Sequence, residues 1–169
     1  MSDAGEGRSV ALDALLPPEM ARRAEELGVA KASMDGGRLF VLAVLAGVFI
    51  ALGAIFSTVA LTAAGDAPWG ATRVLAGVVF SVGLVLVVVG GAELFTGNNL
   101  IVMAWAGRRV DTRALLRNWA IVYAGNFAGA LAVALTAYVA RLHESGDGAL
   151  GAAALGIAAA KLRPAFVQA

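Results

Sequence analysis

Two long stretches of this sequence are apolar and contain no Asp, Glu, Lys or Arg: residues 39–64 and residues 118–140. An α-helix rises 1.5 Å per residue, so their 26 and 23 residues would extend about 39 Å and about 35 Å. The hydrocarbon core of a bilayer is about 30 Å thick, and both helices are long enough to cross it with some tilt. The pattern therefore predicts two membrane-spanning helices over these ranges.

A third apolar stretch, residues 74–106, is too long for one straight span. Its 33 residues would form a helix of about 50 Å, well beyond the hydrocarbon thickness. Irregular backbone is tolerated at membrane depth only where it is buried in protein or lines a wet cavity, so we predict a broken span and a functional site at the break. The break is expected at the polar cluster near residues 93–99, which contains Glu93, Thr96, Gly97, Asn98 and Asn99.

Basic residues around the spans indicate how the chain is oriented. Short loops that remain in the cytoplasm are rich in Lys and Arg. Arg73 is the single basic residue between the first two spans, so that loop is expected outside and the N-terminus in the cytoplasm. The loop between the second and third spans is expected inside because it contains Arg108, Arg109, Arg113 and Arg117.

The remaining segments suggest two parts. Residues 1–38 are predicted to form a cytoplasmic N-terminal segment, with a short interfacial helix that starts at Pro17 and Pro18. Residues 39–169 are predicted to form the transmembrane domain, in which residues 149–160 make a short surface or re-entrant helix. Residues 164–169 are typical of the entry to a fourth span, from which we expect the chain to be a fragment.

The composition narrows the range of functions. Apolar residues make up 60% and charged residues 15% of the 169 residues, which is a poor match to a soluble domain. The net charge of +1 gives no basic field, so no nucleic-acid partner is expected. The sequence has no Cys and a single His, His143, and it offers no cluster typical of a nucleophile, base or metal site. We therefore expect no enzyme activity and no metal or cofactor. We expect membrane lipid to contact the protein.

Glu93 is the most unusual residue of the predicted spans, because an ionised carboxylate at membrane depth is costly without a partner. One interpretation makes it a proton relay or a cation ligand. The other makes it a cap that accepts hydrogen bonds from the N–H groups of Phe95, Thr96 and Gly97. We favour the cap, since a free acid in the pathway would repel an anion.

Four asparagines have structural and functional interpretations. Asn98 and Asn99 are predicted to cap a half-helix that starts near Leu100, whose N-terminus would attract an anion. Asn118 and Asn126 are expected to hydrogen-bond across helices, with a place along the solute path as the alternative.

Small and basic residues add two further hypotheses. Gly125 and Gly129 are spaced to let the third span approach a neighbour closely. Lys161 and Arg163, near the predicted outer mouth, are either interfacial anchors or residues that concentrate anions, and we favour anchors.

Three segments resemble the formate/nitrite transporter family. They are GAELFTGNN at residues 91–99, Asn118-Trp119 followed by YAGNFAGA at residues 123–130, and LLPPEMA at residues 15–21. The resemblance implies an all-α, aquaporin-like membrane fold of two inverted three-span repeats, of which this chain matches the first, with a broken second helix. It also implies homopentamers in the bacterial inner membrane, with one pore in each protomer.

The same resemblance implies a channel or transporter for a small monovalent anion such as formate or nitrite, with a proton as a further partner. A channel for hydrosulfide or water and a non-transporting half-protein are the alternatives. The family's pore His has no counterpart in this sequence, and Glu93 stands where many members have Asp. The resemblance places Phe80 and Leu84 at a cytoplasmic-side constriction and Leu94 at a periplasmic-side one. It places Leu94, together with Phe95 and Thr96, in the central loop, and Lys161 in the outer approach to the pore. The scaffold of the loop would consist of Glu93, Gly97, Asn98 and Asn99.

Overall fold

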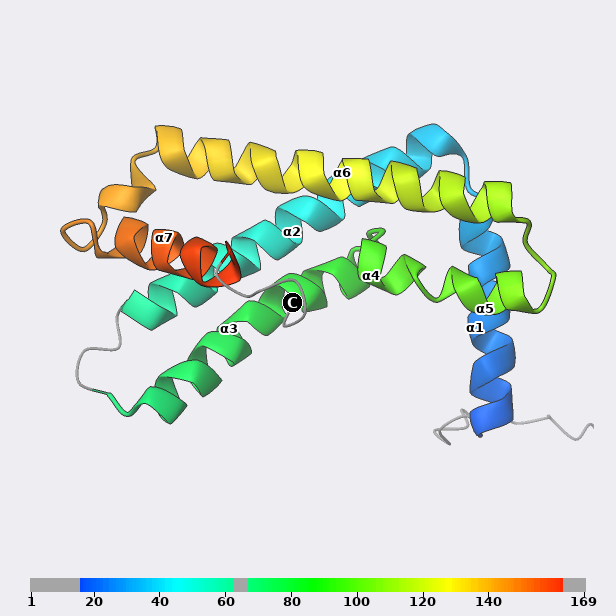
Figure 1. Ribbon diagram of the computed structural model, residues 1–169, viewed down its shortest axis with the longest axis horizontal. Coiled ribbons are helices and arrows are strands. Elements are labelled where there is room, and N and C mark those ends of the chain that lie inside the picture. The colour runs from blue at the N-terminus through cyan, green and yellow to red at the C-terminus, as the bar shows by residue number, and fades with distance from the viewer. Residues whose placement is uncertain (1–15, 63–66, 163–169) are drawn as a thin grey trace, which may run out of the picture.

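The computed structural model describes residues 16–62 and 67–162, and the regular secondary structure in these ranges is all helical. Figure 1 shows α2, α3 and α6 extending along the molecule and α1 lying across one end. Several predicted features lie outside the described residues: residues 1–15, residues 63 and 64 of the first predicted span, Arg163, and the expected start of a fourth span at 164–169. The elements are α1 (Pro17–Ala32), α2 (Gly36–Thr62), α3 (Trp69–Val89), α4 (Phe95–Asn98), α5 (Ile101–Ala106), α6 (Thr112–Val139), the 3₁₀ helix η1 (Leu142–Glu144) and α7 (Ala149–Leu162).

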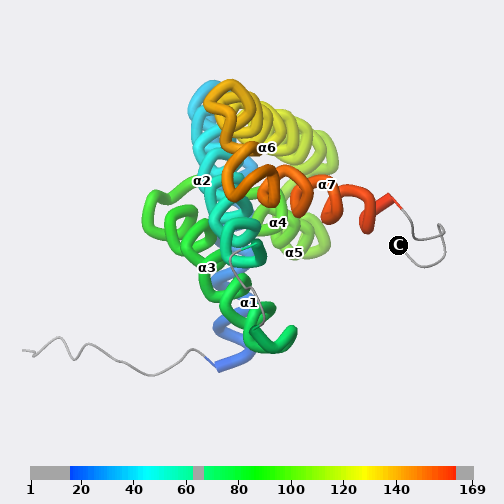
Figure 2. The backbone as a smooth tube through the Cα atoms, turned by 90° about the vertical axis from the view of Figure 1, so that its left-hand side faces the viewer, coloured from blue at the N-terminus to red at the C-terminus, as the bar shows by residue number. Residues whose placement is uncertain are grey.

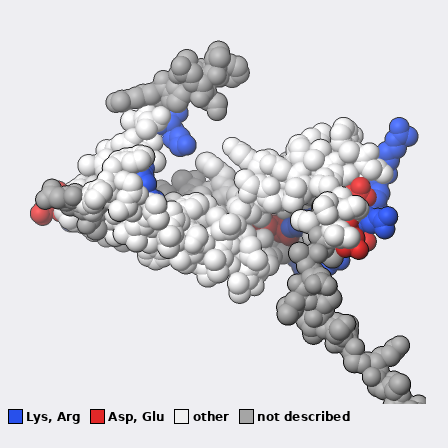
Figure 3. Space-filling model, turned by 90° about the horizontal axis from the view of Figure 1, so that it is seen from below, with Lys and Arg blue, Asp and Glu red and all other residues white. Residues whose placement is uncertain are grey.

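Three of these helices, α2, α3 and α6, are long and apolar enough to cross a membrane. The mean hydropathy of their most apolar windows is 2.9, 2.4 and 1.6. On the face that Figure 3 shows, most charged side chains lie toward the two ends of the molecule, and the middle is uncharged apart from a small adjoining red and blue spot. This distribution is expected when lipid surrounds the middle of a protein.

Helices α2 and α6 lie in backbone contact because glycines face the partner helix. A Cβ atom at Gly47 would overlap the α6 backbone, and one at Gly129 would overlap the carbonyl oxygen of Val44. A Cβ atom at Gly125 would lie 2.5 Å from the Cβ of Ala43. The predicted close packing of Gly125 and Gly129 is therefore confirmed.

Helices α2 and α3 also meet through glycine. A Cβ atom at Gly83 would lie 2.9 Å from the carbonyl oxygen of Phe49, and one at Gly53 would lie 3.0 Å from that of Phe80. Since α2 contacts both α3 and α6, it is the central helix of the bundle.

Helix α1 packs on α5 across one end of the bundle (Figures 1 and 2). Gly28 makes this possible, because a Cβ there would lie 3.0 Å from the Cβ of Ala104. At the C-terminal end of α1, Ala32 forms a buried cluster with Ile101 and Leu115, which joins α1, α5 and α6. The short α5 is thus held between α1 and the bundle.

The predicted short helix over residues 149–160 is present as α7, which packs on α2 and η1. A Cβ atom at Gly151 would lie 2.8 Å from the carbonyl oxygen of His143, so η1 and α7 are in backbone contact. The His143 ring stacks on Tyr138 at a centroid distance of 5.0 Å. The turn after α6 therefore directs α7 back along the bundle.

Candidate functional site

The second apolar stretch breaks in a defined turn at the end of α3. Gly91 has a φ of +60°, and its N–H donates to the carbonyl oxygen of Val88, at 3.3 Å. The N–H of Ala92 donates to Val87 at 3.0 Å, which completes the Schellman pattern of helix termination. Glycine is favoured at Gly91 because a side chain there would be strained by the left-handed backbone. Residues 90–94 are not helical, so the break starts earlier than the predicted range of 93–99.

Asn126 of α6 holds the broken backbone in place. Its Oδ1 accepts from the N–H of Phe95 at 2.9 Å, and its Nδ2 donates to the carbonyl oxygens of Glu93 at 2.9 Å and Ala43 at 2.8 Å. The N–H of Glu93 donates to the carbonyl oxygen of Leu42 on α2, at 3.1 Å. Groups that would have no water at membrane depth are thus paired with α2 and α6. The prediction that Asn126 hydrogen-bonds across helices is confirmed.

The Glu93 carboxylate forms an ion pair with Lys31 of α1. The Nζ of Lys31 lies 2.6 Å from both carboxylate oxygens, and the Glu93 side chain is 7% exposed. Lys31 Nζ also donates to Oδ1 of Asn98, at 3.2 Å. Lys31 thus supplies the counter-charge that a carboxylate buried at this depth needs.

Asn98 and Asn118 extend this pair into a buried network. Asn98 Nδ2 donates to Asn118 Oδ1 at 2.9 Å, and Asn118 Nδ2 donates to the carbonyl oxygen of Lys31 at 3.0 Å. The indole N–H of Trp119 donates to the carbonyl oxygen of Asn98, at 3.0 Å. Among the described residues, every buried side-chain nitrogen and oxygen has a partner. The network therefore connects α1, α4 and α6 without an unpaired polar group.

Three predictions about capping were wrong. Glu93 does not cap the break, because its carboxylate binds Lys31 and the N–H of Phe95 is capped by Asn126. Asn98 is not a cap either, since its side chain binds Lys31 and Asn118. The side chain of Asn99 is exposed and caps no helix in the described chain. The helical half of the break begins at Phe95 in α4, and a two-residue turn of Asn99 and Leu100 with helix-like backbone angles joins α4 to α5.

The apolar residues of the predicted pathway occupy two places. Leu94 packs on a buried cluster of Ala46, Val87 and Ala92 at the break, and the side chain of Thr96 is exposed beside it. Phe95 contacts the aromatic rings of Trp119 and Tyr123 edge-on, with centroids 6.2 and 5.7 Å away. Phe80 and Leu84 lie farther back on α3, 39% and 50% exposed.

The order of these residues along α3 changes their expected sides. Because α3 is one continuous helix from Trp69 to Val89, Phe80 and Leu84 lie between Trp69 and the break, and Leu94 lies at the break. If the Trp69 end faces outward, as the charge pattern predicts, Phe80 and Leu84 lie on the periplasmic side of Leu94. On that predicted orientation, the order along the chain is the opposite of the one that the resemblance implied, and the membrane sides of Phe80, Leu84 and Leu94 stay predictions.

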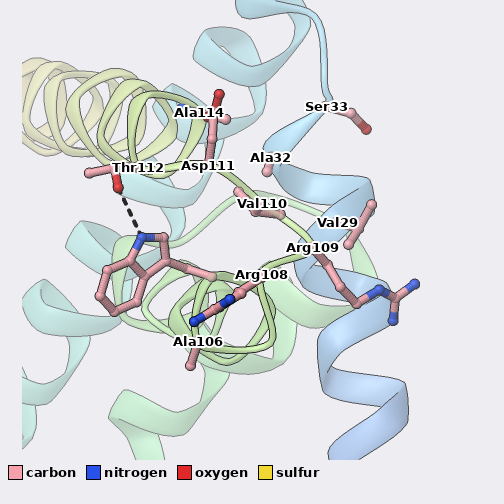
Figure 4. A pocket seen from close by; sticks show the side chains of 11 residues that line it. Val29, Ala32, Ser33, Ala106, Arg108, Arg109, Val110, Asp111, Thr112 and Ala114 are labelled. Carbon is pink, nitrogen blue, oxygen red and sulfur yellow. Dashed lines mark hydrogen bonds between the residues drawn. The ribbon is translucent and has the colours of Figure 1, made fainter.

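Basic residues lie at the end of the molecule where α1, α5 and the loop before α6 meet. A pocket of about 890 Å³ opens there between α1, α5 and the loop before α6, with Arg108 and Arg109 on its wall (Figure 4). The guanidinium group of Arg109 lies 3.7 Å from the carboxylate of Glu25. Asp35 precedes α2 at this end, and the N–H of Arg38 donates to its carboxylate at 3.0 Å, which lowers the pKa of Asp35.

Taken together, a bundle of three apolar helices and a second span broken at a buried polar network define a membrane protein of the channel and transporter type. The family model described as formate/nitrite transporter matches residues 18–169. The chain belongs to the formate/nitrite transporter family, as the sequence motifs suggested.

Its relatives include two bacterial proteins named as formate channels. The chain is 41% identical to the formate channel FocA of Escherichia coli strain K12 over 157 residues, which is 93% of this chain and 55% of that protein. It is 36% identical to formate channel FocA of Haemophilus influenzae over 166 residues, 98% of this chain and 58% of that protein. The chain thus spans about half the length of the curated relatives it matches. These relatives are channels rather than enzymes.

A solved structure confirms the fold class. The chain superimposes on a protein titled "Pentameric formate channel with formate bound" with a TM-score of 0.73 and 39% sequence identity. The match covers 79% of this chain and 52% of that one. The all-α membrane fold with an interrupted second helix is therefore the fold of this family.

Proposed function

We propose that this chain contributes to a channel for formate and similar small monovalent anions, including nitrite. The family and the formate channels among its relatives support this solute class. We further propose that the protein works as a homopentamer in the bacterial inner membrane, with its N-terminus in the cytoplasm. The pentameric neighbour and the basic loop after α5 support these two parts of the proposal.

The observation that carries the proposal is the contrast between the paired and the exposed groups of the break. Side chains of α1 and α6 pair the charge of Glu93 and anchor the backbone, while Thr96 and Gly97 of the same segment are exposed. In the described part of the chain, the hydroxyl of Thr96 has no hydrogen-bond partner. That hydroxyl is free to replace part of the hydration shell of a passing anion.

The pathway residues follow from this arrangement. Thr96 is proposed to donate to the anion where Leu94 and Phe95 exclude water, and Phe80 and Leu84 form an apolar constriction farther out. Lys161 attracts the anion to the outer approach. Glu93, Gly97 and Asn98 support the loop, and Asn99, whose side chain is exposed, contributes only its backbone. A proton is proposed to travel with the anion, since a neutral acid crosses an apolar zone at far lower cost than its anion.

The direct test is solute flux through the protein, produced at the length its gene encodes and reconstituted into liposomes. Labelled formate should enter faster than into empty liposomes, and nitrite should compete with it. Hydrosulfide uptake and osmotic shrinkage assays measure the two alternative solutes. Fast water flux without formate flux would overturn the proposal in favour of a water channel, and no flux of any solute would favour a non-transporting protein.

Orientation and assembly need separate measurements. Reporter fusions after Gly107 and after Gly146 should report cytoplasmic and periplasmic locations, respectively. The opposite pattern would contradict the orientation drawn from the basic loop. Native mass measurement in mild detergent should give five copies, and any other number would contradict the pentamer.

A further inference from the structure

A second polar region lies at the far end of α3 from the break. A pocket of about 610 Å³ opens there between the first turns of α3, the end of α2 and one face of α7. Helix α7 packs on α2 and η1 instead of packing extensively on α3, so this space remains open. Two cationic side chains line it from opposite helices: Arg73 of α3 and Lys161 of α7.

Both cations lack a counter-charge within residues 16–62 and 67–162, where neither forms an ion pair with a described carboxylate. Arg73 is held in position by Trp69, because its guanidinium carbon lies 5.6 Å from the centre of the indole ring. Two positive groups on one pocket repel each other, and an anion between them relieves that repulsion. Among the described residues that line the pocket, the only charged side chains are therefore these two cations, which favours an anion as the ligand.

The position of Arg73 on α3 links this pocket to the proposed constriction. Arg73, Gly77, Phe80 and Leu84 follow the spacing i, i+4, i+7 and i+11, which places them on one face of a helix. That face is open, since a Cβ atom at Gly77 would meet nothing within 4 Å and both Phe80 and Leu84 are exposed. Arg73 lies about 10 Å from Phe80 along the helix axis, by the rise of 1.5 Å per residue.

We propose that Arg73 is an anion-binding residue of the outer mouth, which acts with Lys161 to capture a small monovalent carboxylate or oxyanion before it reaches Phe80. This inference rests on the proposed function. The two cations raise the local concentration of the anion, and the open pocket lets it leave again toward the constriction. Their contribution is electrostatic, so it is largest at low salt and at low anion concentration.

A lipid phosphate could use the same two cations, so the test separates the two sources of negative charge. The protein at its gene-encoded length is reconstituted into vesicles made only of phosphatidylcholine and into vesicles that also contain phosphatidylglycerol. Initial formate uptake is measured against formate concentration at about 10 mM and at about 300 mM salt, conditions that bracket strong and weak screening. The variants are Arg73→Gln, Arg73→Lys, Lys161→Gln and the double glutamine variant.

At low salt, Arg73→Gln should raise the half-saturating formate concentration about three- to tenfold and leave the maximal rate unchanged, because steering acts on capture. Arg73→Lys should retain most of the parent's behaviour, and the double variant should exceed either single change. High salt should bring the parent close to Arg73→Gln. The matched control is Arg141→Gln, because Arg141 is already paired with Glu144 at 2.7 Å, and it should match the parent.

Several results would overturn the inference. Parent-like uptake by Arg73→Gln at low salt would leave capture to Lys161 alone. A lower maximal rate in both Arg73→Gln and Arg73→Lys would indicate a structural role for Arg73. An effect seen only in vesicles with phosphatidylglycerol would assign the cations to lipid. A parent protein that carries no formate would instead refute the proposed function, which makes that failure distinguishable from these.

Discussion

Helix α6 and the path from α3 to α5 pass along the same bundle in different ways. Helix α6 is unbroken over 28 residues, from Thr112 to Val139, although it contains Asn118 and Asn126. The other path leaves helical geometry at residues 90–94 and resumes in α4. The intact helix supplies amide side chains, and the broken path supplies backbone groups that need them.

This difference shows where the break obtains its stability. No side chain within the broken segment caps it, since Phe95 is capped from α6 and Glu93 is paired from α1. Side chains of α1 and α6 thus stabilise the broken segment, and the polar residues of α6 are needed because the backbone between α3 and α4 is not helical. The variants below test that division of roles, from the largest expected effect to the smallest.

Asn126→Leu should have the largest effect on the folded state. It leaves the N–H of Phe95 and the carbonyl oxygen of Glu93 unpaired, at about 1–3 kcal/mol for each group, or about 2–6 kcal/mol in total, and it removes a second bond to the carbonyl oxygen of Ala43, which also accepts within α2. The yield of monodisperse protein and its thermal unfolding midpoint in mild detergent measure this loss. Asn99→Leu is the matched control, because Asn99 is exposed, and equal destabilisation by the two variants would contradict the role of Asn126.

Glu93→Leu should come next, with a loss of about 3–5 kcal/mol, because Lys31 is left without the partner of a largely buried ion pair. The double variant Glu93→Leu/Lys31→Met should recover part of that stability, since it removes the unpaired charge as well. Unfolding midpoints of the two variants provide the comparison. A stable Glu93→Leu protein with altered solute selectivity would show that Glu93 belongs to the pathway and not to the scaffold.

Thr96→Val should change flux and leave the folded state intact. The substitution keeps the side-chain volume and removes a donor worth about 1.5–3 kcal/mol to a charged partner, which lowers formate flux by roughly tenfold or more. Uptake per folded protomer measures this effect. Thr58→Val is the control, because the hydroxyl of Thr58 already donates to Ala54 within α2 at 2.8 Å. Unchanged flux in Thr96→Val would remove Thr96 from the mechanism.

Gly91→Ala should have the smallest effect, about 1–2 kcal/mol of stability, because alanine is strained at the left-handed backbone of this turn. Gly97→Ala is well matched to it, since Gly97 lies in the same segment, has no positive φ, and offers open space to a Cβ atom. The unfolding midpoint should fall for Gly91→Ala only. Equal midpoints would show that the turn tolerates an L side chain.

The sequence alone predicted most of the helices and few of the side-chain hydrogen bonds and ion pairs of the site. Apolar run lengths revealed the three long helices, and the excess length of residues 74–106 required a break. The partner of Glu93 was missed because Lys31 lies 62 residues away, and helical periodicity carries no information about such distant pairs. A buried acid does call for a cation, but several Lys and Arg residues precede the first span, and none was distinguished by its local pattern.

The capping errors have a related physical cause. Asn and Asp side chains are frequent local caps, so Asn98 and Asn99 were assigned to the nearest helix start. In the folded chain, the side chain of Asn98 instead donates to Asn118 and accepts from Lys31, and these tertiary hydrogen bonds replace the local cap. The cap that the break needed came from Asn126, which the sequence identified only as a residue that bonds across helices.

The glycine contacts between α2 and α6 have a consequence for how such a protein can diversify. Glycine is the smallest residue, so every substitution at Gly47 or Gly129 adds atoms where the opposing backbone leaves no room. A single mutation therefore cannot be offset by a smaller neighbour, because the atoms in the way belong to the main chain. Substitutions are tolerated more readily at exposed side chains of α3, such as Leu84 and Val85, because these can be exchanged without moving a helix.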